Sequence, residues 1–481
     1  MSDAGAAPTS MAHDAIVDPS RDDPVVARSI GWLGGPLGRF RAVGSSWWTP
    51  LRVLVIVTTL GYVLGYLLDR SCRSGGWLSP DRYENLCYTD ITALFGIRGF
   101  ADGTIPYLQP GVDGGYLEYP VITGFFMSIA GYISDAVVAI RDTLDPLRTF
   151  FDVNILMLFI PLLITVIATA LTVRRRPWDA MMVAAAPLVI LGATINWDLL
   201  PMMFTALCLL MWSRRSPFGA GIFLGLGAAA KFYPALLLIG FLFLTIRTKQ
   251  WRAFGSLVGG AAVSWLAINV PIALGNFEGW SYFYRFNSER GVDFGSFWYA
   301  ADMLGMPGVA PDKINIVAAG AFALLCILIG VLVLRAPQRP RVASVMFLVV
   351  AAFIVTTKIY SPQYVLWLIP LAVLARPRWR DFLIWQAGEL IYFVAIWWYL
   401  VTYGVDEGRG LNDVQYGLAT MIHIIATLYL AAVVVSDILA PENDPVRTDG
   451  FPEDADDPGG GVFTTPASPN AAVVVTERGL S

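Results

Sequence analysis

Two carboxylates stand where an apolar segment of the sequence begins or turns, and either could do acid–base chemistry. Asp90 opens a segment over 90–101 whose apolar residues have helical spacing, and Asp198 lies at the tip of an apolar hairpin over 179–212. A carboxylate beside a reacting hydroxyl can take its proton as a general base. Asp90 is our first candidate for this role and Asp198 is the second. The structural alternatives are a helix N-cap for Asp90 and a solvated turn residue for Asp198.

Two lysines share a local pattern. Lys231 and Lys358 each end an apolar segment, and each is followed by a tyrosine two residues later and then by a proline, which stops a helix. Ionisable groups at membrane depth are functional by default, so these two breaks predict a site for an anion. The alternatives are a favourable position at a helix C-terminus and long side chains that reach the surface.

A third polar segment, 284–291, holds two arginines. Arg285 and Arg290 flank Asn287, and guanidinium groups suit bidentate recognition of phosphate. The alternative is an ion pair with Glu289 within the same loop. These two arginines and the two lysines form our candidate set for binding the phosphate of a donor.

The composition says which kind of molecule must position these residues. Of 481 residues, 56% are hydrophobic and only 15% are charged, whereas soluble domains have about 45–50% apolar and about 25% charged residues. A water-soluble fold is therefore excluded, and the 13% of aromatic residues excludes a disordered chain. Basic residues occur as small clusters between apolar runs, which is typical of cytoplasmic loops and not of a protein that binds nucleic acid.

The apolar runs predict an all-α polytopic membrane protein with about 12 transmembrane helices over 47–437. A disordered N-terminal arm (1–46) and a disordered acidic tail (438–481) flank this domain, because neither can bury enough apolar surface to fold. Several runs are shorter than the roughly 20 residues that cross a bilayer, which indicates broken or tilted helices around a cavity. The number of crossings is unsettled around 119–134 and 150–173. The chain must cross the membrane an odd number of times between the outward loop 69–118 and the cytoplasmic arginines at 174–176, but two apolar runs lie there.

The arginine clusters predict the orientation. Both termini and the clusters should be cytoplasmic, and the loops 69–118 and 276–312 should face outward; the clusters are at 174–176, 214–215, 247–252, 335–341 and 376–380. The large first outward loop should carry short interfacial helices. Its Cys72 and Cys87 would then form a disulfide in an oxidising exterior, the alternative being two free thiols, while Cys208 and Cys326 would pack within spans.

Several common catalytic patterns are missing from the sequence. It has no Walker loop, no Cys–His zinc pattern and no Asp-x-Asp pair, and its two histidines, His13 and His423, stand alone. Any chemistry must therefore use a substrate available at the outer leaflet.

A lipid flippase or a solute transporter would also use charges within the membrane. Such proteins often have inverted repeats, and we find no internal repeat beyond the similar helix breaks at Lys231 and Lys358.

At these residues the sequence resembles the polytopic GT-C glycosyltransferases, and specifically glycosyltransferase family 87, the actinobacterial polyprenol-phosphate-mannose-dependent mannosyltransferases. The matching pieces extend over 50–437 and are moderately specific together; they are Cys87–Asp90, Glu118–Gly124, Asn196–Asp198, Gly225–Pro234, Phe286–Gly291 and Lys358–Gln363.

The resemblance implies a GT-C-like fold whose large first periplasmic loop carries the catalytic carboxylate, and Asp90 matches that position. Asp90 would deprotonate an acceptor hydroxyl, and the four cations would stabilise the departing polyprenyl phosphate. Further residues of the matching pieces would bind substrate: Glu118, Tyr119, Asn196, Tyr233, Asn287, Tyr360 and Gln363. Many GT-C enzymes have two carboxylates in this loop motif. Asp90 lacks an adjacent partner, which keeps Asp198 as the alternative base and leaves open whether a divalent metal takes part; no cofactor is identified.

The expected function is transfer of mannose from a polyprenyl-phosphate-sugar donor to a cell-envelope glycolipid or lipoglycan, at the outer face of the plasma membrane. An arabinosyltransferase, or a glycan ligase of the same fold, fits the same residues. The expected partners are this donor, this acceptor and the membrane lipids, and the sequence does not specify an oligomeric state.

Overall fold

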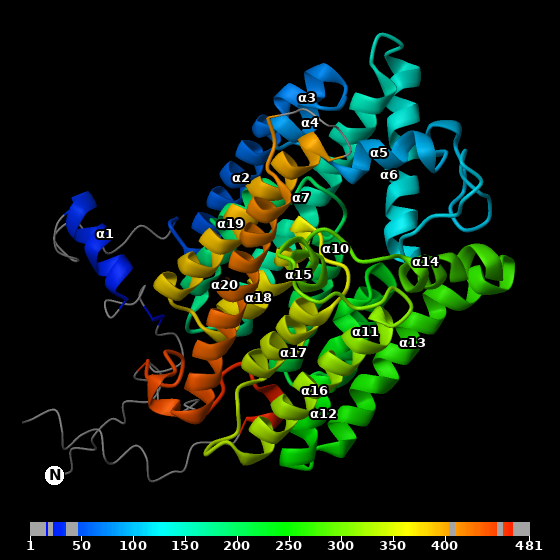
Figure 1. Cartoon of the computed structure of the whole chain (residues 1–481). Helices are drawn as coiled ribbons and strands as arrows, with labels where there is room; N and C mark the ends of the chain where they lie inside the picture. Colours follow the sequence, from blue (N-terminus) through cyan, green and yellow to red (C-terminus); the bar gives the residue numbers. More distant parts are fainter. Residues whose placement is uncertain (1–15, 18–22, 35–46, 404–408, 450–455, 465–481) are drawn as a thin grey trace, which may run out of the picture.

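The computed structural model describes residues 16–17, 23–34, 47–403, 409–449 and 456–464. Within this part the secondary structure is entirely helical (Figure 1). Seven helices are long and apolar enough to cross a membrane: α2 (Pro50–Leu68), α6 (Val121–Ile140), α7 (Pro146–Thr172), α13 (Trp251–Gly275), α16 (Ile314–Arg335), α19 (Trp379–Thr402) and α20 (Asp413–Leu439). These features confirm the predicted all-α membrane class.

Shorter apolar helices complete the bundle, and two pairs of them are single apolar runs that are broken in the middle. α11 (Pro217–Ala230) and α12 (Leu237–Thr248) are joined by a 3₁₀ turn, η3 (Tyr233–Leu236). α17 (Val342–Thr356) and α18 (Val365–Ala375) are joined in the same way by η4 (Pro362–Tyr364). Pro234 and Pro362 cannot donate a backbone hydrogen bond, so the helix stops before each of them.

The segment 177–213 forms a hairpin whose first arm is interrupted. Its ascending arm is divided into η2 (Pro177–Ala180), α8 (Met181–Ala184) and α9 (Pro187–Gly192), and its descending arm is α10 (Leu199–Ser213). Between them lies the tip at 193–198, which contains Asp198. The hairpin predicted over 179–212 is therefore present, although its first arm is not one continuous helix.

The helix α6 lies in the region where the sequence left the number of crossings unsettled. It begins beside the end of α11, where the Thr123 hydroxyl donates to the carbonyl of Ala230 at 2.7 Å. From there it runs along the first half of α7 in the upper part of Figure 1. The start of α6 is therefore level with the end of α11.

The predicted arginine clusters meet at one end of the bundle, together with part of the C-terminal tail. Arg341 pairs with Asp444 at 2.6 Å and Arg175 with Asp449 at 2.9 Å. Further along, Phe463 packs on Trp212, with ring centroids 4.8 Å apart. The expectation of a disordered tail over 438–481 is therefore wrong for 440–449 and 456–464, because buried arginines supply partners for its carboxylates. The remainder of the tail lies outside the described residues.

The N-terminal arm also contains an ordered element. α1 (Pro24–Gly34) is capped by Asp23, whose carboxylate accepts hydrogen bonds from the backbone of Val25 and of Trp379. The expectation of disorder over 1–46 is therefore wrong for 23–34. Most of this arm lies outside the described residues.

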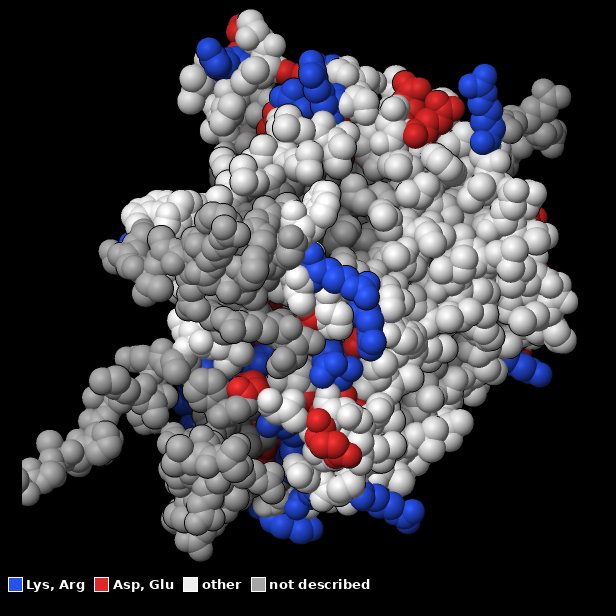
Figure 2. Space-filling view, turned by 90° about the vertical axis from the view of Figure 1, so that its left-hand side faces the viewer, with Lys and Arg blue, Asp and Glu red and all other residues white. Residues whose placement is uncertain are grey.

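Charged side chains are unevenly distributed on the face shown in Figure 2. They gather near the top and from the centre of the view downward, whereas a broad area on the right carries few. Such an area is the surface expected for helices that contact lipid.

The remaining short helices belong to the loops at the other end. The first loop contains α3 (Arg70–Gly75), α4 (Asp81–Glu84), α5 (Asp90–Ile97) and η1 (Phe100–Asp102), and the second contains α14 (Phe277–Glu289) and α15 (Phe297–Met303). α3 to α5 lie at the top of Figure 1, away from the arginine-rich end. These loops bring the candidate residues together.

Candidate active site

The position of Asp90 is fixed by its neighbour Thr89. The Thr89 side chain caps α5 by accepting from the backbone N–H of Ile91, and its hydroxyl donates to the carbonyls of Thr194 and Ile195 at 2.8 and 3.0 Å. The backbone N–H of Asp90 donates to Ile195 as well, at 2.8 Å. Thr89 is therefore the N-cap, and the structural alternative for Asp90 is wrong: its carboxylate is not used as a cap.

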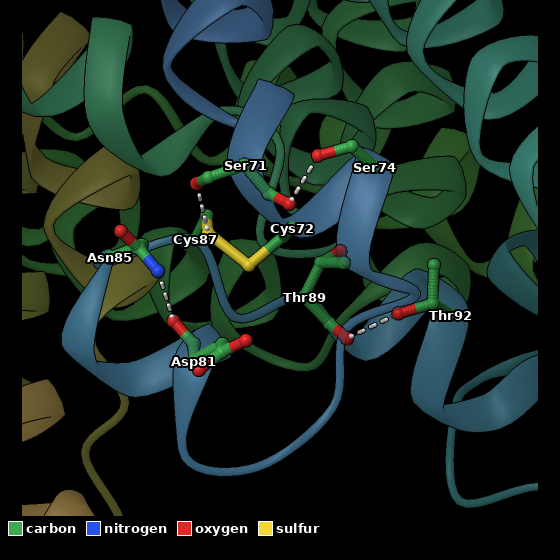
Figure 3. The surroundings of a disulfide bond; sticks show 8 residues. All are labelled: Ser71, Cys72, Ser74, Asp81, Asn85, Cys87, Thr89 and Thr92. Atoms are coloured by element: carbon green, nitrogen blue, oxygen red, sulfur yellow. Dashed lines mark hydrogen bonds between the residues drawn. A yellow bond between two sulfur atoms is a disulfide. The ribbon is translucent and has the colours of Figure 1, made fainter.

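A disulfide restrains the chain on the other side of Thr89. Cys72 in α3 is bonded to Cys87, which lies between α4 and α5 (Figure 3). The predicted disulfide is thus confirmed, and Cys208 and Cys326 are free cysteines within helices. The bond ties the segment before Asp90 to the end of α2, so the carboxylate is held from both sides.

The Asp90 carboxylate is half-buried and bound by phenol groups. The Tyr119 hydroxyl donates to Asp90 Oδ2 at 2.9 Å, and the Tyr88 hydroxyl also bonds the carboxylate. Burial raises the pKa of Asp90, and the two hydroxyls and the positive charge of Lys231 oppose this rise. The carboxylate is therefore more basic than an ordinary aspartate, which suits a general base.

Lys231 and Asp198 form a buried ion pair. The chain is extended at Lys231 (φ −160°, ψ 150°), because α11 ends at Ala230, and its ammonium lies 3.0 Å from Asp198 Oδ1. The other carboxylate oxygen, Oδ2, accepts from the Trp367 indole N–H at 2.9 Å, and the side chain of Asn196 holds the backbone N–H of Asp198. With only 1% of its surface exposed, Asp198 is a counter-ion for Lys231 and not a solvated turn residue.

Tyr119 connects the two charged centres. Its hydroxyl bonds Asp90, its ring lies 4.9 Å below the Lys231 ammonium, and Asn196 donates to its hydroxyl at 3.3 Å. Residues from the first loop, the hairpin tip and the α11–α12 break therefore converge on one point, as the sequence predicted. A cation over an aromatic face is itself favourable.

This point opens into a cavity of about 450 Å³. Candidates predicted from sequence that line it are Asp90, Glu118, Tyr119, Lys231, Asn287, Arg290, Tyr360 and Gln363. Asp198 and Asn196 do not line it, because they lie behind Lys231 and Tyr119. The cavity thus holds a carboxylate and cations together, with polar and aromatic walls.

A second cavity of about 480 Å³ adjoins the first. Both are lined by Lys231, Phe283, Asn287 and Tyr364, but the rest of the second wall is mostly apolar, with side chains from α16, α17 and the α11–α12 break. Tyr233, a predicted site residue, belongs to this wall and stacks on Trp367, with centroids 4.5 Å apart. An apolar cavity that leads to a lysine suits an amphiphile with an anionic head group.

The two lysines with the same sequence pattern have different surroundings. The Lys358 ammonium donates to the carbonyl of Ser288 at 3.0 Å and to that of Arg290, at the C-terminal end of α14. It lines only the apolar cavity. Lys358 therefore satisfies the C-terminal carbonyls of α14, a helix other than the one that it follows in the sequence, and in doing so positions Arg290.

The two arginines also differ. Arg290 lines the first cavity and pairs with Asp293 at 2.9 Å, whereas Arg285 is exposed, donates to the carbonyl of Glu278 and lines neither cavity. Neither of them pairs with Glu289 among the described contacts. Burial raises the pKa of Asp293, and Arg290 opposes this rise.

Two further predicted residues are held by ion pairs or hydrogen bonds in the cavity wall. Glu118 accepts from Arg98 at 2.6 Å, and the Tyr360 hydroxyl donates to Glu389 at 2.8 Å. Sequence reasoning missed Glu389 and Asp293. It also missed Trp397, which lines the cavity from α19 with no local pattern to mark it. Tyr88 was within the motif Cys87–Asp90, and its distance of two residues from Asp90 was the signal that could have found it.

No three His, Cys, Asp or Glu side chains of the described residues are grouped in a way that could hold a metal ion. Asp90 and Glu118 both line the cavity, but Glu118 is already paired with Arg98.

Comparison with known proteins gives the family. The profile of "Glycosyltransferase family 87" matches residues 118–357, a range that includes Tyr119, Asp198, Lys231 and Arg290. The chain belongs to this family. The protein is therefore a multi-pass membrane glycosyltransferase, and the transporter alternative is set aside. No curated protein matches the sequence.

Among solved structures, the family 87 protein is similar to ArnT from Cupriavidus metallidurans bound to undecaprenyl phosphate. The two chains have 14% sequence identity and a TM-score of 0.42, and the match covers 82% of this chain and 78% of ArnT.

Proposed function

We propose that this family 87 glycosyltransferase transfers mannose from a polyprenyl-phosphate donor to a glycolipid or lipoglycan of the cell envelope, at the outer face of the plasma membrane. The observation that carries the proposal is the convergence of Asp90 and Lys231 on Tyr119, in a cavity that continues into an apolar one. A lipid-linked phosphate and a hydroxyl acceptor need this combination: an apolar groove, a cation and a base.

The donor would occupy both cavities. Its isoprenoid chain would lie in the apolar cavity, where burial of hydrocarbon is favourable, and its phosphate would lie near Lys231 and Arg290, at the entrance to the polar cavity. Asn287 lines both cavities and could bind the same group. Arg285 and Lys358 have no direct role in this arrangement, because the first lies outside both cavities and the second holds the end of α14.

The reaction would be a single displacement. The acceptor hydroxyl loses its proton to Asp90, its oxygen bonds to the anomeric carbon, and the bond from that carbon to the phosphate oxygen breaks. Polyprenyl phosphate leaves with the electron pair, so its charge increases from −1 to −2. Lys231 and Arg290 stabilise this new charge, and a β-linked donor gives an α-glycoside.

Asp198 has a supporting role in this mechanism. It fixes the Lys231 ammonium at the site, and Trp367 and Asn196 fix Asp198 in turn. Because the pair is buried and neutral overall, Lys231 retains its charge away from bulk water. Asp198 is therefore a positioning residue, and Asp90 is the base.

A donor assay tests the proposal directly. Purified protein would be given polyprenyl-phosphate mannose with a radiolabelled sugar, together with envelope glycolipids, and polyprenyl-phosphate arabinose in a parallel reaction. We expect label in the glycolipid with the mannose donor only, and a rate about 10²–10⁴-fold lower with Asp90→Asn. Transfer of arabinose instead, or of a whole preassembled glycan, would replace mannosyl transfer with one of the two alternatives from the sequence.

A further inference from the structure

Three aromatic side chains form a wall in the polar cavity, away from the apolar one. Tyr83 and Tyr88 come from the first loop and Trp397 from α19; we call these three residues the aromatic wall. All three line the polar cavity and none lines the apolar cavity.

The Tyr83 ring is nearly parallel to the other two rings of the aromatic wall, whereas Tyr88 and Trp397 are tilted by 33° to each other. The centroid distance is 5.8 Å between Tyr83 and Tyr88, with an angle of 17° between the rings, and 6.3 Å between Tyr83 and Trp397, with an angle of 15°. Tyr88 and Trp397 are 5.1 Å apart. Arg82 lies over both tyrosines, with its guanidinium carbon 4.7 Å from the Tyr83 centroid.

The wall continues along one face of α19. Tyr392, Ile396, Trp397 and Leu400 all line the cavity, and their spacing puts them on the same side of the helix. The nine residues from Tyr392 to Leu400 extend for about 12 Å. The wall therefore belongs to an uncharged part of the cavity lining. Tyr83 and Tyr88 are half-buried, whereas Tyr392, Ile396 and Trp397 each expose 3% of their surface or less.

The chemistry of this surface suits the apolar face of a sugar. The C–H bonds on one face of a pyranose ring carry partial positive charge, and the faces of aromatic rings are negative, so the two stack favourably. The buried indole N–H of Trp397 has no hydrogen-bond partner among the described residues. No lysine or arginine is among the α19 residues that line the cavity, so a lipid phosphate would find no cation on that wall.

The wall is joined to the general base. Tyr88 belongs to the wall and bonds the Asp90 carboxylate, so a sugar on the wall would have hydroxyl groups next to the base. The donor phosphate is assigned to Lys231, which also lines the apolar cavity, whereas no residue of the wall does. The acceptor hydroxyl must attack from the side opposite to the leaving group, which places the acceptor at the wall.

We infer that Tyr83, Tyr88 and Trp397 form the acceptor subsite, and that it binds an uncharged sugar ring of a glycan already present on the acceptor. This inference rests on the proposed function and names the part of the acceptor that the enzyme recognises. It also gives three residues a role in specificity that their sequence context does not indicate.

Steady-state kinetics with full-length protein test the assignment. We expect Tyr83→Leu and Trp397→Leu to raise the KM for the glycolipid acceptor roughly tenfold or more, while the KM for the donor stays within about twofold. Trp398→Leu is the matched control, because the neighbouring Trp398 is 45% exposed and does not line the cavity. A raised donor KM with an unchanged acceptor KM would overturn the inference.

A binding measurement separates this inference from the proposed reaction. Saturation-transfer NMR with methyl α-D-mannopyranoside, on the full-length protein in nanodiscs, needs neither donor nor turnover. We expect transfer to the ring C–H protons with wild type and with Trp398→Leu, and its loss with Tyr83→Leu, a half-buried position on a short helix. No signal with wild type, or an unchanged signal with Tyr83→Leu, would overturn the subsite. Sugar binding without any glycosyl transfer would instead refute the proposed function alone.

Discussion

Asp90 and Asp198 differ in what their carboxylates are free to do. Asp198 is occupied by Lys231 and by Trp367 and is nearly inaccessible. Asp90 lines the cavity, and its partners are the hydroxyls of Tyr88 and Tyr119. A phenol can exchange its bond for one to an incoming hydroxyl, whereas separating a buried ion pair is strongly unfavourable. The residues therefore divide into a base and a counter-ion.

The raised pKa of Asp90 has a consequence for the pH profile. The base must be ionised, so kcat/KM should fall as pH decreases through the pKa of Asp90, at a higher pH than the value of about 3.9 for a free aspartate. Tyr119→Phe removes a hydrogen bond that favours the charged form, so it should raise this pKa further and shift the acid limb to higher pH. Tyr132→Phe, at an exposed position of α6, serves as the control. An acid limb that does not move in Tyr119→Phe would contradict this role.

At the scale of the elements, the first loop positions the base through covalent and backbone contacts. α5 is too short to be stable alone, and it depends on the hairpin tip and on the disulfide between Cys72 and Cys87. The broken helices contribute in a similar way. Because α11 ends at Ala230, the extended residue Lys231 lies beside Tyr119 and Asp198.

Removal of the disulfide should destabilise this loop. Closing a loop of 15 residues is worth about 3 kcal/mol in the unfolded-chain model, so Cys72→Ser should lower Tm and also kcat, because Asp90 is then held less firmly. Thermal unfolding in detergent with and without reductant measures the first effect. Cys326→Ser, a free cysteine in α16, is the control. Equal Tm values for wild type and Cys72→Ser would show that the bond does not hold the loop.

Much of this arrangement follows from the sequence, and the rest depends on tertiary contacts. Apolar runs and prolines marked the helices and both breaks, because hydrophobicity and the missing N–H of proline are local properties. The choice of Thr89 over Asp90 as the cap was not local: it depends on the carbonyls of Thr194 and Ile195, more than 100 residues away. Lys231 and Lys358 likewise share one pattern, and only their neighbours in space separate a site residue from a helix cap.

Over the whole molecule, the charges are divided between two ends. At the arginine-rich end, carboxylates of the C-terminal tail pair with Arg175, Arg339 and Arg341. At the other end, carboxylates and cations line the cavity. Composition alone predicted a disordered tail, because it cannot show that Arg341, 2% exposed, needs a partner from outside the bundle. That partner is Asp444.

The tail should therefore contribute to stability. Asp444→Asn leaves the Arg341 charge buried without its carboxylate, which costs about 3–5 kcal/mol in comparable buried pairs, and Tm should fall. Glu442→Gln, at an exposed position two residues before, should leave Tm unchanged. Thermal unfolding of the two variants in detergent compares them. An unchanged Tm in Asp444→Asn would mean that the tail does not support the bundle.

The orientation of the two ends is a separate prediction. The proposed reaction needs the cavity on the outer side, so a cysteine introduced at Asp102 should react with an impermeant maleimide in intact cells, and one introduced at Arg174 should react only after lysis. Both positions are exposed, at opposite ends of the bundle. The reverse labelling pattern would place the cavity in the cytoplasm and contradict the proposed use of a donor at the outer leaflet.

The most direct test of the account compares the two carboxylates in the donor assay, as kcat for Asp90→Asn and Asp198→Asn. Loss of a general base costs about 10²–10⁴-fold in rate. We predict a loss of this size, and no acid limb in the residual rate, for Asp90→Asn. Asp198→Asn should lose less activity and keep the acid limb of wild type. The opposite result would be loss of the acid limb in Asp198→Asn together with a kcat close to that of wild type in Asp90→Asn. That result would contradict the assignment of Asp90 as the base.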